Sequence, residues 1–330
     1  MKIIISGGRQ SKSSLSYFNK EWSSGVCGVI FEYDTDSKKI EEMFTYETPK
    51  KYRAEKDYSI SFKSGSIDNN KLYITTLTEI LIISLPNYKL IDRISLNLFN
   101  DLHHVVHENN FLYIVVTGLD LVLQYDLIKK RVSNYYNCFR EADTWDRFDK
   151  NKDYRKLNTT KPHFSHPNHV TIHNNKVYIT RYKQEDVLVY EKKGKYIGNI
   201  KLGNGIPHDG SIFNNEFIYT TVIGKIIKVD ISKEKINKII DLNKFAKEDC
   251  SLGWCRGYNS AKNLNYVGFS RIRPTKFIEN IKWLGSKMTD KYKLKMPTRV
   301  EIYDNKYSKI IDTIELERVG LNWVFSILKY

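Results

Sequence analysis

Several features that would identify common protein classes are missing from this sequence. It has no apolar run near the roughly 18 residues that a membrane helix needs. Its four cysteines (Cys27, Cys138, Cys250 and Cys255) form no C-x-x-C pair, which argues against a zinc knuckle and favours reduced thiols. The first residues, MKIIISGG, lack a small-residue cleavage site and favour a strand over a signal peptide. We therefore expect a cytoplasmic protein with no membrane span.

Acidic residues are outnumbered by basic ones. The chain has 53 Lys and Arg against 38 Asp and Glu, a formal charge of +15, which favours a small anionic molecule or a glycan as partner. The basic residues are scattered and form no stripe interleaved with aromatics, so the pattern does not favour nucleic acid. Lys, Asn and Ile are also abundant together, as in proteins of AT-rich genomes. The sequence contains neither a G-x-S-x-G elbow nor a phosphate-binding glycine loop after a strand.

What the sequence does contain is a repeat marked by four Asn-Asn pairs. The pairs begin at Asn69, Asn109, Asn174 and Asn214, spaced by 40, 65 and 40 residues, and each precedes an apolar run: KLYITT, FLYIVV, KVYITR and EFIYTT. Asparagine tolerates positive φ, so an Asn-Asn pair between extended runs predicts a hairpin of type I′. The longer middle spacing indicates one 40-residue unit with an insertion of about 25 residues.

Each repeat unit also contains two further predicted strands. Runs such as QYDL, LVYE and IKVD supply the third strand, and KLIDRISL, KYIGNIKL and KINKIIDL supply the fourth. Four short antiparallel strands per 40 residues are typical of a β-propeller blade. The N-terminal unit lacks an innermost strand, whereas LNWVFSILKY is surplus at the C-terminus. We therefore predict an all-β, six-bladed β-propeller, a single domain over residues 1–330, closed by pairing of the C-terminal strand with the N-terminal blade.

The repeat places three histidines at one structural position. His104 and His169 each lie nine residues before the central tyrosine of the next strand, and His208 lies ten residues before the equivalent Ile218. We predict that all three begin innermost strands and point to one mouth of the central channel. Equivalent positions in other blades hold Ser64 and Arg256, and Asn322 is a looser candidate in the closing strand.

Long connections are expected on the same face as these histidines. Residues of about 139–166 join blades three and four, and residues of about 274–297 interrupt blade six, so both segments are predicted to form a rim or lid over the channel. The segment 9–25 fills a similar connection in the first blade. Arg181, Arg271 and Arg273, near the ends of second strands, are predicted to reach this rim and bind substrate.

Two kinds of chemistry suit the predicted histidine group. Three neutral imidazoles that converge can bind one divalent metal ion, such as Zn, Mn or Fe, and leave positions for water or substrate. Alternatively, one imidazole is a general base while the others and Arg256 hold an anionic group. A third interpretation, without chemistry, is that these are polar residues in a wet channel. The sequence does not separate the three.

The remaining histidines are predicted to matter less. Strand alternation turns His103 away from the position of His104. His107 and His173 lie near the turns at the other end of their strands and are interpreted as surface residues. His163 and His166 lie in the predicted lid as reserve ligands. Asp209 is equally suited to orient an imidazole and to face the blade core.

The phrases HHV, NHV, PHDG, CRGY and GFSRIR resemble those of an uncharacterised family of bacterial six-bladed propellers. Members of that family are often encoded near polysaccharide-biosynthesis genes, which implies a glycan context and no specific reaction. The architecture is more distantly similar to gluconolactonase-like and strictosidine-synthase-like propellers and to arylsulfate sulfotransferases, which use channel histidines and an arginine. The calcium ligands of the first group are Glu, Asn and Asp, whereas this chain has His and Arg. Propeller polysaccharide lyases with histidine-bound metal are a further analogy.

Two functional hypotheses follow from the sequence. The first is an enzyme with a catalytic site of His104, His169, His208 and Arg256, possessing either a metal held by the histidines or a histidine base. It would act as a lyase, hydrolase or transferase on an anionic sugar or small acidic metabolite in cell-surface glycan metabolism. The second is a non-catalytic propeller that serves as a binding or scaffold protein.

Overall fold

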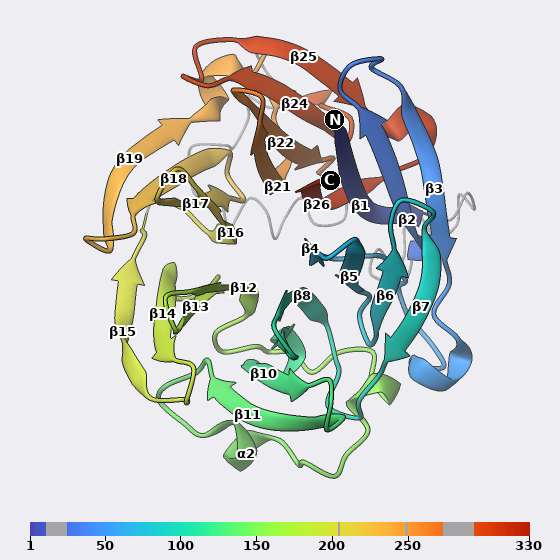
Figure 1. Ribbon diagram of the computed structural model, residues 1–330, viewed down its shortest axis with the longest axis vertical. Coiled ribbons are helices and arrows are strands. Elements are labelled where there is room, and N and C mark those ends of the chain that lie inside the picture. Colours follow the sequence, from blue (N-terminus) through green and yellow to red (C-terminus); the bar gives the residue numbers. More distant parts are fainter. Residues whose placement is uncertain (11–24, 204, 248–249, 273–293) are drawn as a thin grey trace.

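The computed structural model describes residues 1–10, 25–203, 205–247, 250–272 and 294–330. These residues form six four-stranded antiparallel sheets arranged as the blades of a ring (Figure 1). No helix among them is long and apolar enough to cross a membrane. The predicted six-bladed β-propeller is therefore confirmed.

Blade 1 combines strands from both ends of the chain, and blades 2 and 3 follow it in sequence. From the channel outward, blade 1 contains β26 (Trp323–Lys329), β1 (Lys2–Gln10), β2 (Gly25–Asp34) and β3 (Ile40–Tyr46). Blade 2 contains β4 (Gly65–Asp68), β5 (Lys71–Thr75), β6 (Ile80–Ser84) and β7 (Lys89–Ile94). Blade 3 contains β8 (Leu102–Glu108), β9 (Phe111–Val116), β10 (Leu121–Asp126) and β11 (Arg131–Asn137).

The other three blades follow in chain order. Blade 4 contains β12 (Pro167–His173), β13 (Lys176–Arg181), β14 (Asp186–Glu191) and β15 (Tyr196–Lys201). Blade 5 contains β16 (Pro207–Phe213), β17 (Glu216–Thr221), β18 (Lys225–Asp230) and β19 (Lys235–Asp241). Blade 6 contains β21 (Trp254–Ala261), β22 (Leu264–Ser270), β24 (Arg299–Asp304) and β25 (Ile310–Glu315). A separate parallel pair joins β20 (Cys250–Ser251) to β23 (Leu294–Lys295).

The C-terminal strand closes the ring as predicted. β26 pairs antiparallel with β1, and the hydroxyls of Ser6 and Ser326 lie 2.6 Å apart across this junction. With β26 in place, β1 is an interior strand of blade 1, and β26 takes the innermost position beside the channel.

The asparagine turns adopt the backbone that the sequence predicts. Both residues have positive φ in the turns at 69–70, 174–175 and 214–215, as a type I′ hairpin requires, and Asn109 does so in the fourth. The core lies between neighbouring blades. One apolar cluster fills each of the six interfaces, for example that of Leu112 and Ile114 with Ile80 and Ile82 of the preceding blade. Central strands are buried on both faces, which explains their continuous apolar runs.

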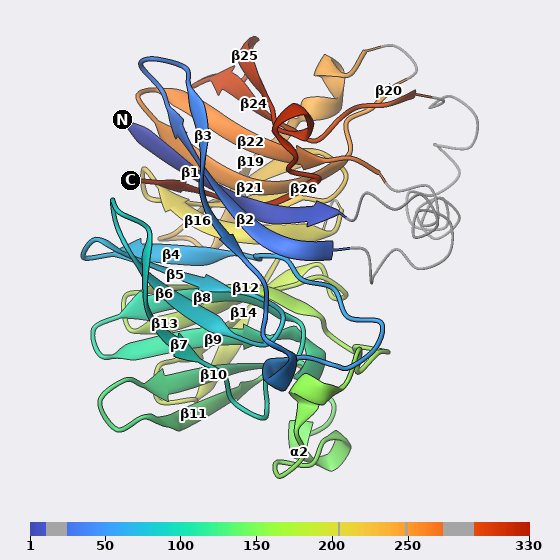
Figure 2. The same cartoon turned by 90° about the vertical axis from the view of Figure 1, so that its right-hand side faces the viewer.

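The long connection between blades 3 and 4 projects on one face of the ring. It contains the short helix α2 (Thr144–Arg147) and lies on the side away from the two chain ends (Figure 2). The innermost strands begin on this face. Most of the predicted insertion in blade 6, and most of the 9–25 segment, lie outside the described residues.

Candidate functional site

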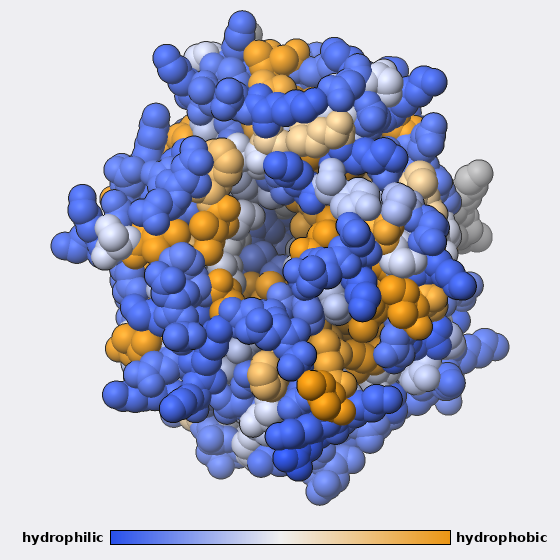
Figure 3. Space-filling view, in the orientation of Figure 1, coloured by the Kyte–Doolittle hydropathy of each residue, from blue (hydrophilic) through white to orange (hydrophobic). Residues whose placement is uncertain are grey.

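Two cavities with no lining residue in common occupy the channel. The larger, which we term the mouth cavity, has a volume of about 890 Å³ and opens on the face of α2. Among the residues that line it are Lys63, His103, Lys161, His163, His166, Tyr182, Lys183, Glu185, His208, Trp254, Arg256, Arg271, Trp323 and Phe325. The far cavity, of about 430 Å³, lies toward the other face, where the surface is hollowed at the centre of the ring (Figure 3).

Irregular pairing at the start of the innermost strands determines which residues reach each cavity. The register shifts between Leu102 and His104 in β8, and between His208 and Ser211 in β16. At such a bulge two successive residues no longer alternate regularly across the sheet. In five blades the first residue of a pair therefore lines the mouth cavity and the second lines the far cavity: Lys63 and Ser64, His103 and His104, His208 and Asp209, Arg256 and Gly257, and Phe325 and Ser326.

The predicted common position of His104, His169 and His208 is wrong. His104 and His169 line the far cavity, whereas His208 lines the mouth cavity. Counted back from the asparagine turn, Asp209 corresponds to His104 and His169, since each lies five residues before the first asparagine. Blade 5 therefore has no extra residue before its turn, and its bulge after His208 corresponds to the bulge between Leu102 and His104 in blade 3. His208 therefore shares its cavity with His103, which alternation had placed elsewhere.

His208 is held by the carboxylate of the next residue. Its Nδ1 lies 3.1 Å from Oδ1 of Asp209, whose Oδ2 accepts hydrogen bonds from Thr220 Oγ1 (2.6 Å) and the Gly257 N–H (2.8 Å). An ionised carboxylate only accepts, so Nδ1 of His208 carries the hydrogen and Nε2 is the basic nitrogen. His208 is 3% exposed, and its Nε2 has no hydrogen-bond partner among the described residues.

Burial and neighbouring charges keep this pair in one protonation state. Burial lowers the pKa of His208, and the cation of Arg256 lowers it further, although Asp209 opposes both effects. Burial by itself would raise the pKa of Asp209, but the adjacent imidazole of His208 and its hydrogen bond bring that pKa below the ordinary value. A neutral imidazole beside an ionised carboxylate results.

His103 also lines the mouth cavity, and its ring has the same tautomer as that of His208. Its Nδ1 lies 2.9 Å from the carbonyl oxygen of Asp101 and 2.9 Å from Oγ1 of Thr117. Thr117 donates its own hydroxyl hydrogen to the carbonyl of Pro167 (2.5 Å). Both neighbours of Nδ1 therefore act as acceptors, so Nδ1 carries the hydrogen and Nε2 is left as an acceptor. Burial lowers the pKa of His103 to about 3, against the opposing charge of Asp101.

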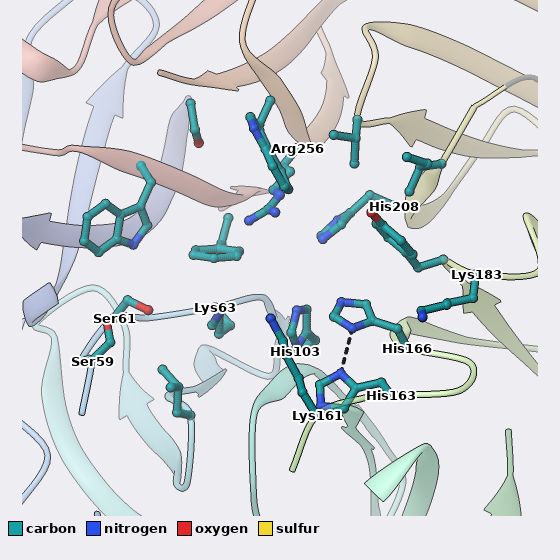
Figure 4. Close-up of a pocket in the computed structure, with 18 of the residues that line it drawn as sticks. Ser59, Ser61, Lys63, His103, Lys161, His163, His166, Lys183, His208 and Arg256 are labelled. Carbon is teal, nitrogen blue, oxygen red and sulfur yellow. Dashed lines mark hydrogen bonds between the residues drawn. The ribbon is translucent and has the colours of Figure 1, made fainter. Parts of the chain in front are cut away.

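The connection between blades 3 and 4 adds two further imidazoles and a lysine. The buried Asp120 carboxylate accepts hydrogen bonds from the N–H groups of Phe164 (2.7 Å), Ser165 (3.0 Å) and His166 (2.8 Å). This anchors the segment that places Lys161, His163 and His166 in the cavity wall. Nδ1 of His163 and Nδ1 of His166 share a hydrogen at 2.9 Å (Figure 4).

The mouth cavity is electropositive and partly aromatic. Five cationic side chains line it against the single carboxylate of Glu185, as far as the described residues show: Lys63, Lys161, Lys183, Arg256 and Arg271. The guanidinium of Arg256 lies 4.6 Å from the ring centroid of Trp254 and 4.9 Å from that of Phe325. The ammonium of Lys63 lies 4.1 Å from the centroid of the same Phe325 ring, so both cations contact one aromatic side chain.

The far cavity contains a stacked imidazole pair. The rings of His104 and His169 lie 3.7 Å apart with an interplanar angle of 19°. Burial lowers the pKa of both, that of His169 to about 4. Ring-nitrogen lone pairs lie in the ring plane, so stacked rings direct them side by side and not at one point.

This geometry does not suit the predicted metal-binding set. No group of three or more His, Cys, Asp or Glu side chains within the described ranges is arranged to hold a metal ion. The three predicted ligands are also divided between two cavities. His104, His169 and His208 therefore do not form a common ligand set, and the divalent metal cofactor itself stays a prediction.

The other predicted substrate-binding residues do not lie together in one cavity. Arg271 lines the mouth cavity and pairs with Glu317 (3.2 Å), whereas Arg273 lies outside the described residues. Ser64 lines the far cavity. Asn322 accepts a hydrogen bond from the N–H of Gln10 (2.7 Å) and does not line the mouth cavity.

Arg181 is a structural residue of blade 4 and not part of the rim. Its Nε and Nη2 each lie 2.8 Å from a different oxygen of Asp186, and Nη1 donates to the carbonyl of Cys138 (2.8 Å). It is 6% exposed and absent from the lining of both cavities. A buried carboxylate five residues later therefore binds both sides of the guanidinium group, and substrate binding by Arg181 stays a prediction.

Sequence reasoning missed Lys63, His103, Trp323 and Phe325 in the mouth cavity. Each is next to, or three residues from, a residue that the repeat had selected. An alignment allowing for a bulge at the start of every innermost strand would have found them.

Comparison with known proteins supports the fold. No family model and no curated protein matches the sequence. The chain is similar to the crystal structure of a protein of unknown function from Bacteroides caccae, with a TM-score of 0.61 and 10% identity over 99% of this chain and 98% of that chain. A hydrazine synthase from Kuenenia stuttgartiensis gives a TM-score of 0.48 and 12% identity over 75% of this chain and 63% of that chain. At 10% identity, the likeness to the Bacteroides caccae protein concerns the fold alone.

Proposed function

We propose that this protein is an enzyme that binds an anionic sugar or small acidic metabolite in the mouth cavity and uses His208 as general base. One observation carries the proposal. The Nδ1 hydrogen of His208 is directed to Asp209, and its basic Nε2 is buried without a hydrogen-bond partner among the described residues, in a side chain that lines the mouth cavity. A carboxylate that orients an imidazole also stabilises the imidazolium formed when the base takes a proton.

The surrounding side chains suit an anionic substrate. Lys63 and Arg256 supply positive charge beside the base, where they would hold an anionic group and stabilise negative charge that develops during reaction. The indole rings of Trp254 and Trp323 offer flat apolar surface for a sugar ring. A volume of about 890 Å³ falls within the usual range for small-molecule sites.

The chemical step that this arrangement supports is proton abstraction. His208 Nε2 accepts a proton from a substrate hydroxyl, a bound water or a carbon next to a carboxylate, and Asp209 balances the resulting charge. Lyases, hydrolases and transferases share this step. The resemblance to propellers encoded near polysaccharide-biosynthesis genes supports cell-surface glycan metabolism as the setting.

The test uses a panel of uronic acids, sugar phosphates and sugar sulfates. Binding is measured by calorimetry and turnover by NMR of the reaction mixture, for the wild type and for His208→Gln. We expect His208→Gln to bind within a few-fold of the wild type and to lose about 100-fold or more in turnover, the usual share of a general base.

A matched control is available on the innermost strand of blade 3. His107→Gln changes a histidine that is hydrogen-bonded to Asp68 (2.8 Å) at the opposite end of β8, and it should leave turnover intact. Full turnover by His208→Gln would refute the proposal. Binding without turnover by the wild type would favour the alternative, a non-catalytic binding or scaffold protein.

A further inference from the structure

We infer that the mouth cavity selects an anion that carries its own hydrogen-bond donor, so that it takes phosphate monoesters and rejects sulfate esters. This inference rests on the proposed function, since it names the anionic group of that substrate. Sugar phosphates become the substrate class in place of sugar sulfates.

The hydrogen-bond acceptors considered in the cavity wall are two imidazole nitrogens. Nδ1 of His103 is committed to Asp101 and Thr117, and Nδ1 of His208 is committed to Asp209. Each ring therefore keeps only its Nε2 lone pair as an acceptor, and that of His208 is buried without a hydrogen-bond partner among the described residues. The two ring centroids lie 6.3 Å apart, close enough for one small ligand to contact both.

Lys63 and Arg256 lie near the same two imidazole rings. Lys63 opposes protonation of both His103 and His208, and Arg256 opposes that of His208, which places these positive charges near the two rings. An anion attracted to Lys63 and Arg256 thus meets imidazole lone pairs. An oxygen without a hydrogen repels a lone pair, and a buried acceptor left unpaired costs enough to weaken binding about fivefold to 100-fold.

Protonating the histidines would remove that conflict, but their surroundings resist it. His103 faces the charges of Asp101 and Lys63 and the rings of His166 and His208. His208 faces Asp209, Arg256 and Lys63. Burial outweighs the two carboxylates and lowers the pKa of both histidines. The ligand must therefore bring the hydrogen, which its P–OH group donates to Nε2 of His103, while Nε2 of His208 stays available as the base.

Phosphate and sulfate differ in this respect. A phosphate monoester has a second pKa near 6, so at neutral pH its protonated form is readily accessible and offers a P–OH donor. A sulfate ester has the same tetrahedral shape and no hydrogen at any pH where the protein is folded. Discrimination between them thus depends on the acceptors and not on size.

The test compares inorganic phosphate with sulfate, and glucose 6-phosphate with glucose 6-sulfate, by calorimetry at pH 7 and constant ionic strength. We expect each phosphate to bind about tenfold or more tightly than its sulfate counterpart. Tighter binding of glucose 6-phosphate than of inorganic phosphate would identify the ester as the ligand; the reverse would identify free phosphate.

Variants separate the acceptors from the cations. A glutamine amide supplies an N–H donor where a histidine offers a lone pair, so the double variant His103→Gln/His208→Gln should bind sulfate and phosphate equally. Arg256→Met should weaken both anions by a similar factor. The comparison of phosphate with sulfate is made on the wild-type protein, so it tests the inference even if a variant does not fold.

The outcomes distinguish this inference from the function on which it rests. Equal binding of phosphate and sulfate by the wild type, with both lost in Arg256→Met, would overturn the selectivity and leave the anion site intact. Absence of binding by all four probes would overturn the selectivity and the anionic substrate together.

Discussion

His208 and Asp209 are consecutive in the chain and hydrogen-bonded to each other through Nδ1 and Oδ1 at 3.1 Å, yet they line opposite cavities of the channel. Asp209 has a φ of 58°, a left-handed conformation within the bulge of β16. That backbone allows its side chain to turn back toward the preceding imidazole while Oδ2 binds Thr220 and Gly257. The bulge thus builds a carboxylate–imidazole pair from two neighbouring residues.

Asp209→Asn should leave the His208 ring in place but prevent its Nε2 from acting as a base. The asparagine amide can donate to Nδ1 of His208, which moves the ring hydrogen to Nε2. We expect turnover to fall about 100-fold or more while substrate affinity changes much less. Long-range proton–nitrogen NMR of the histidine rings would report the tautomer independently of any substrate.

The control for this variant is Thr220→Val, which removes one hydrogen bond to Asp209 and keeps its charge. It should retain the tautomer and most of the turnover. An unchanged tautomer and full turnover in Asp209→Asn would show that the carboxylate does not set the state of His208.

The sequence predicted the blades because their signals are local. Asparagine turns, apolar central strands and the surplus C-terminal strand each depend on residues a few positions apart, and the structure has all three. The side-chain directions at the channel were less predictable. A bulge is a pairing irregularity between two strands. Strict alternation placed His103 away from the position of His104, and the residue count to Ile218 placed His208 beside His104; both placements were wrong because of the bulges.

Substitution of Arg181 should lower stability and leave phosphate affinity unchanged, whereas substitution of Arg256 should mainly lower phosphate affinity. Arg181→Met leaves the carboxylate of Asp186, which is fully buried, without its guanidinium partner, and breaking such a pair costs about 3 kcal/mol of unfolding free energy. Its phosphate affinity should match that of the wild type. Arg256→Met should weaken phosphate binding with a smaller loss of stability. Urea unfolding and calorimetry on both proteins check this, and weak phosphate binding by a stable Arg181→Met would restore Arg181 as a ligand contact.

Asp120 does not line the mouth cavity, but its hydrogen bonds should hold in place the segment that carries His163 and His166. Asp120→Ala removes the acceptor for three N–H groups of residues 164–166, so hydrogen exchange there should accelerate. Unfolding free energy should fall by about 2 kcal/mol or more, and phosphate should bind more weakly. Asp126→Ala is a suitable control, because Asp126 accepts from Ile128 and Lys129 at the other end of β10. Equal effects of the two variants on phosphate affinity would contradict the assignment.

The buried histidines should make the protein less stable in mild acid. In the folded state burial holds the pKa of His103 at about 3 and that of His169 at about 4, below the ordinary 6.5. Between those values the unfolded chain binds more protons than the folded one, so stability is complete above pH 6.5 and decreases as the pH falls. Each imidazole should cost up to about 2 kcal/mol between pH 6.5 and 5. Urea unfolding at pH 7 and pH 5 measures the loss, which should be smaller in His103→Gln; a free energy of unfolding that does not change over this range would mean that these rings are not buried in their neutral form.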